Sequence, residues 1–448
     1  SRTPMSDEDW QNKLAETTKE FAAGVFTPQT WNEFKTQIHY HAGDISDTES
    51  FQTLKQRLEQ LEGNTDSDRL YYLSTAPKFY AEAAEQLGKA GLAVEAPGHS
   101  RRLVIEKPFG TDGASADALN EVVHRHFQES QIYRIDHYLG KETVNNVLVL
   151  RFANAIFEPI WNRNYIENIQ ITANEDVLVG RRAPYYETAG VLRDMFQNHL
   201  LQILTFAAME PPANFDAKAV RDEKVKVLQS IRPMTTDEVL QNTVRGQYRS
   251  YRDEQGVAAN SSTATYAAVK LMIDNWRWKG VPMFLRSGKG MSCRSTQIVI
   301  QFRRPPHLLF NKPAAQPAAL SSVPGNRLLI QIQPAEGIQL YFMTKVPDTE
   351  MNIQQTELTF NFQKSFRGTM PDSYQRLLLD ALHGDASLFA RSDEVAAAWN
   401  IIDPIQKTWD SGAVSEPDFY ELGSFGPVRS HQWIAGFGQE WFDLCPVV

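Results

Sequence analysis

The stretch from Arg134 to Glu142 reads Arg-Ile-Asp-His-Tyr-Leu-Gly-Lys-Glu and places an acid, an imidazole, a phenol and two cations around one glycine. It follows the apolar-alternating run 131–133, which is typical of a strand end. Where a strand ends and a helix begins, side chains lie over the open edge of a sheet, where α/β folds usually bind ligands. We therefore predict that this stretch forms the floor of an anion-binding active site.

The side chains of this stretch differ in the chemistry they can support. Arg134, His137, Tyr138 and Lys141 carry hydrogen-bond donors that suit a phosphate dianion. Asp136 does not suit such a ligand, so it must serve another purpose. A carboxylate among cations commonly orients and stabilises a second imidazole that takes up a proton during turnover.

His199 is the best candidate for the imidazole that Asp136 would orient. It lies in the motif Arg-Asp-Met-Phe-Gln-Asn-His-Leu, within the stretch 185–208 of helical composition. Asp194, Gln197 and His199 cannot all share one face of an α-helix, so some of them must point to solvent or to a cleft. A single histidine on a helix is more often a packed or surface residue. The polar neighbours and Asp136 favour a site.

Three motifs together resemble the glucose-6-phosphate dehydrogenase family. They are the stretch 134–142, the sequence Glu-Lys-Pro-Phe-Gly at 106–110, and the motif that contains His199. The similarity runs along nearly the whole chain, and three independent motifs in the right order make a chance match improbable. The resemblance implies oxidation of D-glucose 6-phosphate to 6-phosphogluconolactone by hydride transfer from C1 to NADP, the first step of the oxidative pentose phosphate pathway.

The resemblance also implies a role for individual residues. His199 would be the general base that takes the proton of the C1 hydroxyl, and Asp136 would stabilise the resulting imidazolium. His137, Tyr138 and Lys141 match the family positions that hold the 6-phosphate. The other positions that match substrate contacts are Lys107, Glu175, Asp194, Lys289, Arg294 and Gln333.

Two residues match family positions that contact the cofactor. Lys107 follows the apolar run 103–105, at the carboxyl end of an expected strand, where it would contact both sugar and nicotinamide. In the family the peptide bond to Pro108 is cis, and we expect the same here. Arg2 matches an arginine that grips the adenosine 2′-phosphate, which favours NADP over NAD. A frayed terminal cation is an equally good interpretation of Arg2.

One part of the family pattern is missing from the sequence. The family opens with a strand and a glycine-rich turn that seats the dinucleotide phosphates, but no Gly-x-Gly-x-x-Gly occurs in this chain. We expect the first strand, turn and helix of the nucleotide domain to be absent, as in a truncated chain. Two alternatives to the dehydrogenase remain open: a catalytically silent sugar-phosphate-binding homologue, and an oxidoreductase for a different sugar.

The hydrophobic period changes along the chain and predicts two domains. Up to Asp136, helical patterns alternate with short apolar runs at 70–73 and 103–105, and Ser6 opens the first helix with a capping pattern. This alternation indicates a parallel sheet. We predict an α/β, doubly wound, Rossmann-like nucleotide domain, N-terminally incomplete, over residues 1–136.

The second predicted domain, residues 137–448, is of the α+β class and would bind the substrate and form the dimer contact. Helices are expected from Lys141 to about Ile231. Alternating apolar residues then predict a large antiparallel sheet with one buried face, at 298–302, 328–332, 338–342 and 358–362. Two further helices are expected near 373–383 and 392–408, and the low-complexity stretch 313–320 is expected to form a loop.

Composition limits the class of protein and its partners. The chain has 448 residues and a formal net charge of −9, which disfavours nonspecific nucleic-acid binding. No apolar run approaches the roughly 18 residues that span a membrane. His39 and His41 lack further ligands at a recognisable interval, so we expect no metal site. The resemblance implies a homodimer or homotetramer.

The chain has two cysteines, Cys293 and Cys445, with no paired spacing. We therefore expect no disulfide scaffold and no structural zinc, and a reducing compartment, the cytoplasm. The cations Lys289 and Arg294 near Cys293 would favour its thiolate, but an ordinary thiol is the better interpretation.

Overall fold

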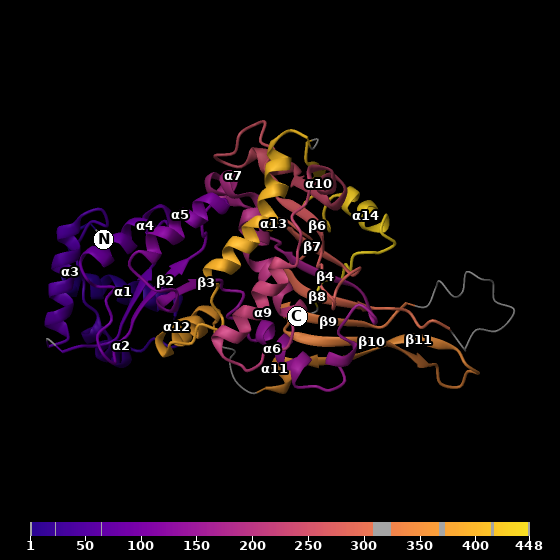
Figure 1. The fold of residues 1–448 in the computed structure, drawn as a ribbon, viewed down its shortest axis with the longest axis horizontal. Helices are drawn as coiled ribbons and strands as arrows, with labels where there is room; N and C mark the ends of the chain where they lie inside the picture. Colours follow the sequence, from indigo (N-terminus) through magenta and orange to yellow (C-terminus); the bar gives the residue numbers. More distant parts are fainter. Residues whose placement is uncertain are drawn as a thin grey trace. The chain divides into compact units, whose positions relative to one another are not determined.

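The structure is a computed structural model that describes residues 2–22, 24–63, 65–307, 324–366, 372–413 and 416–446. These residues form two compact units, one of Ser1–Glu106 with Ala118–Tyr133 and one of Lys107–Asp117 with Arg134–Val448 (Figure 1). The expected loop at 313–320 lies outside the described residues.

The first unit combines helices with a three-stranded sheet of strand order β1-β2-β3. The helices are α1 (Asp7–Phe21), α2 (Pro28–Phe34), α3 (Thr48–Leu61), α4 (Tyr80–Lys89) and most of α5 (Gly113–His124), and the strands are β1 (Arg69–Leu73), β2 (Arg101–Glu106) and β3 (Ile132–Ile135). The parallel pairing of β1 with β2 confirms the expected parallel arrangement. Ser6 caps α1 as expected, since its Oγ accepts the amide N–H of Asp9 at 3.0 Å.

The second unit is built on a nine-stranded sheet of order β11-β10-β9-β8-β4-β7-β6-β5-β12. Its strands are β4 (Ile166–Asn174), β5 (Thr243–Tyr248), β6 (Tyr266–Met272), β7 (Pro282–Gly288), β8 (Ser295–Phe302), β9 (Arg327–Gln333), β10 (Gly337–Lys345), β11 (Ile353–Asn361) and β12 (Asp418–Tyr420). The four alternating runs form β8 to β11, with antiparallel pairing, as expected. The pairs β4–β7 and β5–β12 are parallel, which the sequence did not predict.

The helices of the second unit include a π-helix at Leu192–Leu200. The α-helices are α6 (Glu142–Phe152), α7 (Ala183–Val191), α8 (Leu201–Ala208), α9 (Ala217–Gln229), α10 (Thr236–Asn242), α11 (Phe362–Ser365), α12 (Ser373–His383), α13 (Ser392–Asp410) and α14 (Val428–Ala435). Helix α13 packs against α9 and the π-helix (Figure 1). Among the described residues, no helix is both long and apolar enough to cross a membrane.

Strand β4 contradicts the expectation that helices fill the chain from Lys141 to Ile231. It lies in the middle of the sheet, between β8 and β7, and nearly all of its residues are buried. Its apolar residues alternate with polar ones, and such a pattern predicts a face in water. Here the polar face is covered, so the expectation of a single buried face is also wrong for these central strands.

The cover is the C-terminal segment 439–445, which we call the strap. Asn168 Nδ2 donates to Gln439 Oε1 at 2.7 Å, and Gln170 Nε2 donates to the carbonyl of Glu440 at 2.8 Å. Arg286 of β7 pairs with Asp443 at 2.6 Å. The strap therefore gives Asn168, Gln170 and Arg286 polar partners, and without such partners their burial would cost free energy.

A disulfide between Cys293 and Cys445 ends the strap, with Cα atoms 5.9 Å apart. This contradicts the expectation that no disulfide forms. The two cysteines are 152 residues apart in sequence, so spacing gave no signal, and only the return of the strap across the sheet brings them together.

We predict that opening this disulfide destabilises the protein. A bond that closes a loop of 152 residues restricts the unfolded chain by about 5 kcal/mol on the chain-entropy account. A reductant should therefore lower the midpoint of thermal unfolding by several degrees. The variant Cys293→Ser should unfold at the lower temperature with or without reductant. Wild-type protein whose midpoint is unchanged after mass spectrometry shows both thiols free would contradict the prediction.

Candidate active site

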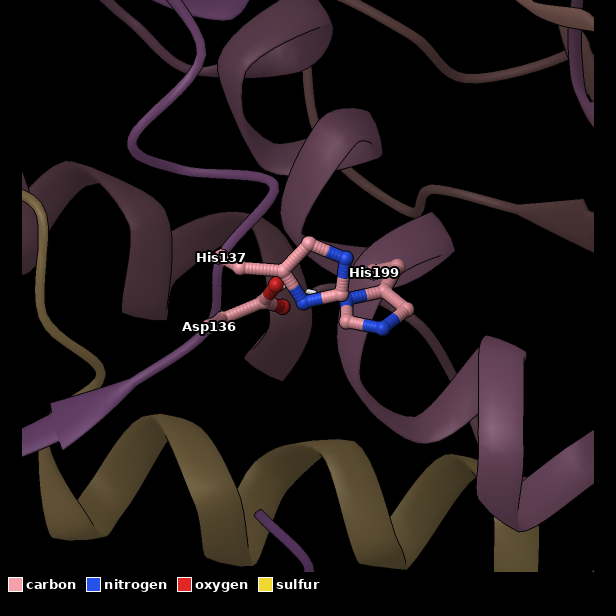
Figure 2. Close-up of side chains that lie close together, drawn as sticks. All are labelled: Asp136, His137 and His199. Atoms are coloured by element: carbon pink, nitrogen blue, oxygen red, sulfur yellow. Dashed lines mark hydrogen bonds and ion pairs between the residues drawn. The ribbon is translucent and has the colours of Figure 1, made fainter. Parts of the chain in front are cut away.

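The site is built where β3 ends and α6 begins. β3 ends at Ile135, α6 starts at Glu142, and the residues between them carry the side chains that the sequence singled out. Asp136 and His137 come from this connection, whereas His199 comes from the π-helix, and the three side chains lie together in Figure 2. The expected strand-to-helix switch is confirmed.

A buried hydrogen bond joins Asp136 to His199. The distance from Asp136 Oδ1 to His199 Nδ1 is 2.5 Å, and both side chains are almost completely buried. On the other side of the ring, Lys107 Nζ lies 2.7 Å from His199 Nε2. Because an ammonium can only donate, Nε2 carries the lone pair and Nδ1 carries the proton.

This arrangement keeps Asp136 ionised and His199 neutral. Burial opposes ionisation of Asp136, but its contact with His199 holds the pKa of the carboxyl well below its usual range. Burial lowers the pKa of the His199 imidazole, against the opposing charge of Asp136, and Lys107 lowers it further. A neutral imidazole backed by a carboxylate is the arrangement of a general base.

The π-helix explains how Asp194 and His199 reach the same side. In an α-helix, residues five apart differ by roughly 140° in direction, whereas i to i+5 bonding brings them nearly into line. Lys107 Nζ touches both residues, at 3.0 Å from the carbonyl of Asp194 and 2.7 Å from His199 Nε2. The stretch 185–208 is helical as expected, but its bonding around His199 is that of a π-helix, and Gly190, at φ 60°, interrupts the helical backbone near the end of α7.

Asp194 lies within a network of alternating charges. Its carboxylate is 3.5 Å from Lys107 Nζ and 3.3 Å from Lys289 Nζ, and Lys289 also binds Glu175. Burial opposes ionisation, but Lys107 and Lys289 lower the pKa of Asp194 to about 2. Asp194 and Glu175 are therefore acceptors and Lys289 is a donor, a combination that can bind several hydroxyl groups.

A second group of side chains surrounds Lys141. Its ammonium donates to Gln333 Oε1, while Gln333 Nε2 lies 2.9 Å from Thr296 Oγ1 and 3.4 Å from the Tyr138 hydroxyl. Burial lowers the pKa of Lys141, and the nearby charge of Arg294, which is itself exposed, lowers it further. Two cations and a phenol at this end suit a phosphate group.

His137 connects the two groups. Its ring centre is 4.7 Å from that of His199 and 4.9 Å from that of Tyr138, and the Tyr374 ring stacks on it at 6.1 Å. Burial lowers the pKa of His137 to about 3. His137 is therefore a neutral side chain that can donate one hydrogen bond.

Three side chains of the site, Asp136, His137 and His199, have possible metal-ligand atoms that all lie within 4.8 Å of one another. At this distance they could also hold a metal ion. The hydrogen bond between Asp136 and His199 already accounts for that proximity. The Lys107 ammonium also lies against His199 Nε2, and it occupies the lone pair that a metal ion would need. Base chemistry therefore explains this cluster better than metal binding.

The structure adds three residues that sequence reasoning did not assign to the site. Arg182, whose side chain is 62% exposed, reaches the Asp194 carboxylate at 3.7 Å. Thr296 binds Gln333, and Tyr374 stacks on His137. Thr296 lies on β8 and Tyr374 on α12, remote in sequence from any motif, so a pattern search had no signal for either.

The residues matched to the cofactor are described separately, because they belong to different units. The peptide bond between Lys107 and Pro108 is cis, as expected. The guanidinium of Arg2 is 82% exposed and lies 3.7 Å from the Asp44 carboxylate.

Comparisons with known proteins identify the family of this chain. Residues 1–146 match the family model described as glucose-6-phosphate dehydrogenase, NAD binding domain, and residues 148–442 match its C-terminal domain. The glucose-6-phosphate 1-dehydrogenase of Aggregatibacter actinomycetemcomitans is 42% identical, over 98% of this chain and 89% of the relative. That of Bacillus subtilis strain 168 is 42% identical, over 97% of this chain and 90% of the relative.

Solved structures show the same relationship. A glucose-6-phosphate dehydrogenase in complex with its substrate glucose-6-phosphate superimposes with a TM-score of 0.89, at 34% identity, over 99% of this chain and 90% of that one. The enzyme from Mycobacterium avium gives a TM-score of 0.83 at 33% identity, over 99% of this chain and 91% of that one. Sequence, fold and site geometry agree, and this chain belongs to the glucose-6-phosphate dehydrogenase family.

Proposed function

We propose that the protein oxidises D-glucose 6-phosphate at C1 and forms 6-phosphogluconolactone, with NADP as the hydride acceptor. The observation that carries the proposal is the buried His199, whose Nδ1 binds Asp136 and whose Nε2 faces Lys107. A base of this kind beside a phosphate-binding group fits a phosphorylated sugar. The complete set of polar side chains speaks against a silent binding protein.

His199 would take the proton of the C1 hydroxyl at Nε2 as the hydride leaves C1. The proton stays on Nε2, and Asp136, bound to Nδ1, stabilises the imidazolium. Lys107 occupies Nε2 in this structure, so it must release that atom when the hydroxyl arrives. The carbonyl of Asp194 at 3.0 Å and its carboxylate at 3.5 Å offer the ammonium other acceptors.

The rest of the sugar would be held by the two groups already described. Asp194, Glu175 and Lys289 would bind ring hydroxyls, since they supply both acceptors and a donor. His137, Tyr138, Lys141, Arg294 and Gln333 would surround the 6-phosphate. Holding both ends of the sugar would fix C1 next to His199, which is how binding energy is converted into rate.

A nicotinamide coenzyme supplies the hydride acceptor, and we propose that this chain prefers NADP. Lys107 would contact the nicotinamide side and Arg2 the adenosine 2′-phosphate, because an exposed guanidinium suits a phosphate. We place the functional boundary at 136/137, so that residues 1–136 bind the coenzyme. The ratio of kcat/KM for NADP to that for NAD should fall in Arg2→Ala, and an unchanged ratio would remove Arg2 from this role.

We further propose a homodimer or homotetramer located in the cytoplasm. The outer strand β11 leaves Leu358 61% exposed and Phe360 38% exposed, as contact surfaces often do. Sedimentation analysis of Leu358→Glu, expected to weaken association, tests the first proposal. The disulfide speaks against the cytoplasm, where such bonds are rare. Thiol trapping in intact cells tests the location, because cytoplasmic protein should contain free Cys293.

We predict that Lys141→Ala raises the KM for glucose 6-phosphate by more than tenfold, because the 6-phosphate loses a charge-assisted contact. The KM for unphosphorylated glucose should change little. Lys279→Ala, which removes an exposed lysine paired with Asp274, is the matched control and should leave both constants unchanged. Equal effects of Lys141→Ala on both sugars would refute the phosphate assignment.

We predict that His199→Asn lowers kcat by about 10²–10⁴ while binding of glucose 6-phosphate, followed by calorimetry, persists. Asp136→Asn should cause a smaller loss, because the base remains but its partner is neutral. His431→Asn is the control, since His431 forms a similar pair with Asp443 at 2.8 Å outside the site. Near-normal turnover in His199→Asn would show that another group is the base.

The pH dependence of kcat/KM should follow the pKa of His199, because only the neutral imidazole accepts a proton. Since that pKa is lowered, activity should extend to lower pH than an ordinary histidine allows. Lys107→Met removes a charge that lowers the pKa, so the acidic limb should move to higher pH. Asp136→Asn removes a charge that raises the pKa, so the limb should move to lower pH. Shifts in the same direction would contradict this electrostatic account.

A further inference from the structure

The π-helix carries two of the functional residues, Asp194 and His199, and its geometry needs support. A π-helix is rare, and its i to i+5 bonding is usually confined to a single turn, often at functional sites. Here it runs for nine residues, Leu192–Leu200, between α7 and α8. If this segment relaxed to α-helical bonding, Asp194 and His199 would point in directions roughly 140° apart. They could then no longer both contact Lys107.

The side chain of Asn198 bridges the backbone of Arg193 and His199. Its Oδ1 accepts the amide N–H of His199 at 2.6 Å, and its Nδ2 donates to the carbonyl of Arg193, the residue before Asp194, at 3.1 Å. The side chain is 5% exposed, so water hardly competes for these contacts. The amide group therefore links the beginning of the π-turn to its end.

We propose that Asn198 is a positioning residue that holds the π-helix in the register where Asp194 and His199 face Lys107 together. Asn198 spends both its oxygen and its nitrogen on the backbone of its own helix, and it makes no contact with Asp136 or Lys107 among the hydrogen bonds of the described residues. Its effect on the reaction passes through His199. The proposal thus rests on the proposed role of His199 as the base.

An asparagine side chain suits this bridge better than an aspartate or an alanine side chain. Its side chain carries one donor and one acceptor, and the bridge uses both, for an N–H and a carbonyl that belong to residues six apart in sequence. An aspartate would keep the acceptor and lose the donor, and an alanine would lose both. The residue type therefore offers a graded test.

The test is a kinetic comparison of Asn198→Ala with wild type, alone and combined with His199→Asn. We expect Asn198→Ala to lower kcat by about tenfold to a hundredfold, the cost of a misplacement near 1 Å, while the KM for glucose 6-phosphate changes less than threefold. In the His199→Asn background the same substitution should have no further effect on kcat, because the group that it positions is already gone.

Asn168→Ala is the matched control. Asn168 is another buried asparagine whose amide donates to a side chain, Gln439, but it lies on β4 and supports the strap. Its substitution should lower the temperature of unfolding and leave kcat unchanged. Losses of kcat that multiply in the double variant Asn198→Ala with His199→Asn would overturn the proposal, as would wild-type kcat in Asn198→Ala.

Asn198→Asp keeps the test decisive if the alanine variant does not fold. It retains an oxygen for the His199 amide, so the expected loss of kcat is smaller, about three- to tenfold, and again absent in the His199→Asn background. An undiminished kcat in Asn198→Asp would show that the hydrogen bond to the Arg193 carbonyl does not position His199. The proposed function can fail separately: if His199→Asn keeps its turnover, the base assignment falls before the role of Asn198 is measured.

Discussion

The hydrogen bond between Asp136 and His199 is the interaction on which the rest of the site depends. Two ionisable groups are almost completely buried there, and burial alone would neutralise both. Their contact resolves the conflict, because the ionised carboxylate accepts a hydrogen bond from the Nδ1–H group and the imidazole remains neutral. The position of this proton decides what the ring can do, since Nε2 is then the only ring atom able to accept a proton.

Separate segments of the second unit bring Asp136, His199 and Lys107 together. The connection after β3 supplies the carboxylate, the π-helix supplies the imidazole, and Lys107, which follows β2 in the sequence, supplies the cation. Alternating charges continue through Asp194, Lys289 and Glu175. In such a network each buried charge has an opposite neighbour, which is the condition under which buried charges are tolerated.

The sequence predicted the parts of this protein that are local. Ser6 began a helix, alternation predicted β8 to β11, and the connection 134–142 was recognised from its residue types alone. What it could not predict depends on chain segments far apart. Strand β4 was not predicted, because the strap that covers its polar face comes 270 residues later. The π-helix was missed because residue spacing was judged by α-helical geometry.

The strap has a consequence for the order in which the protein is made. Synthesis runs from the amino terminus, so β4, β7 and β8 emerge from the ribosome well before residues 439–445. Until then Asn168, Gln170 and Arg286 lack their partners in the strap, and the polar face of the sheet is open to water. Residues 439–445 thus cover the sheet only after its strands have been made, and until then the site residues are all present while the central strands are uncovered.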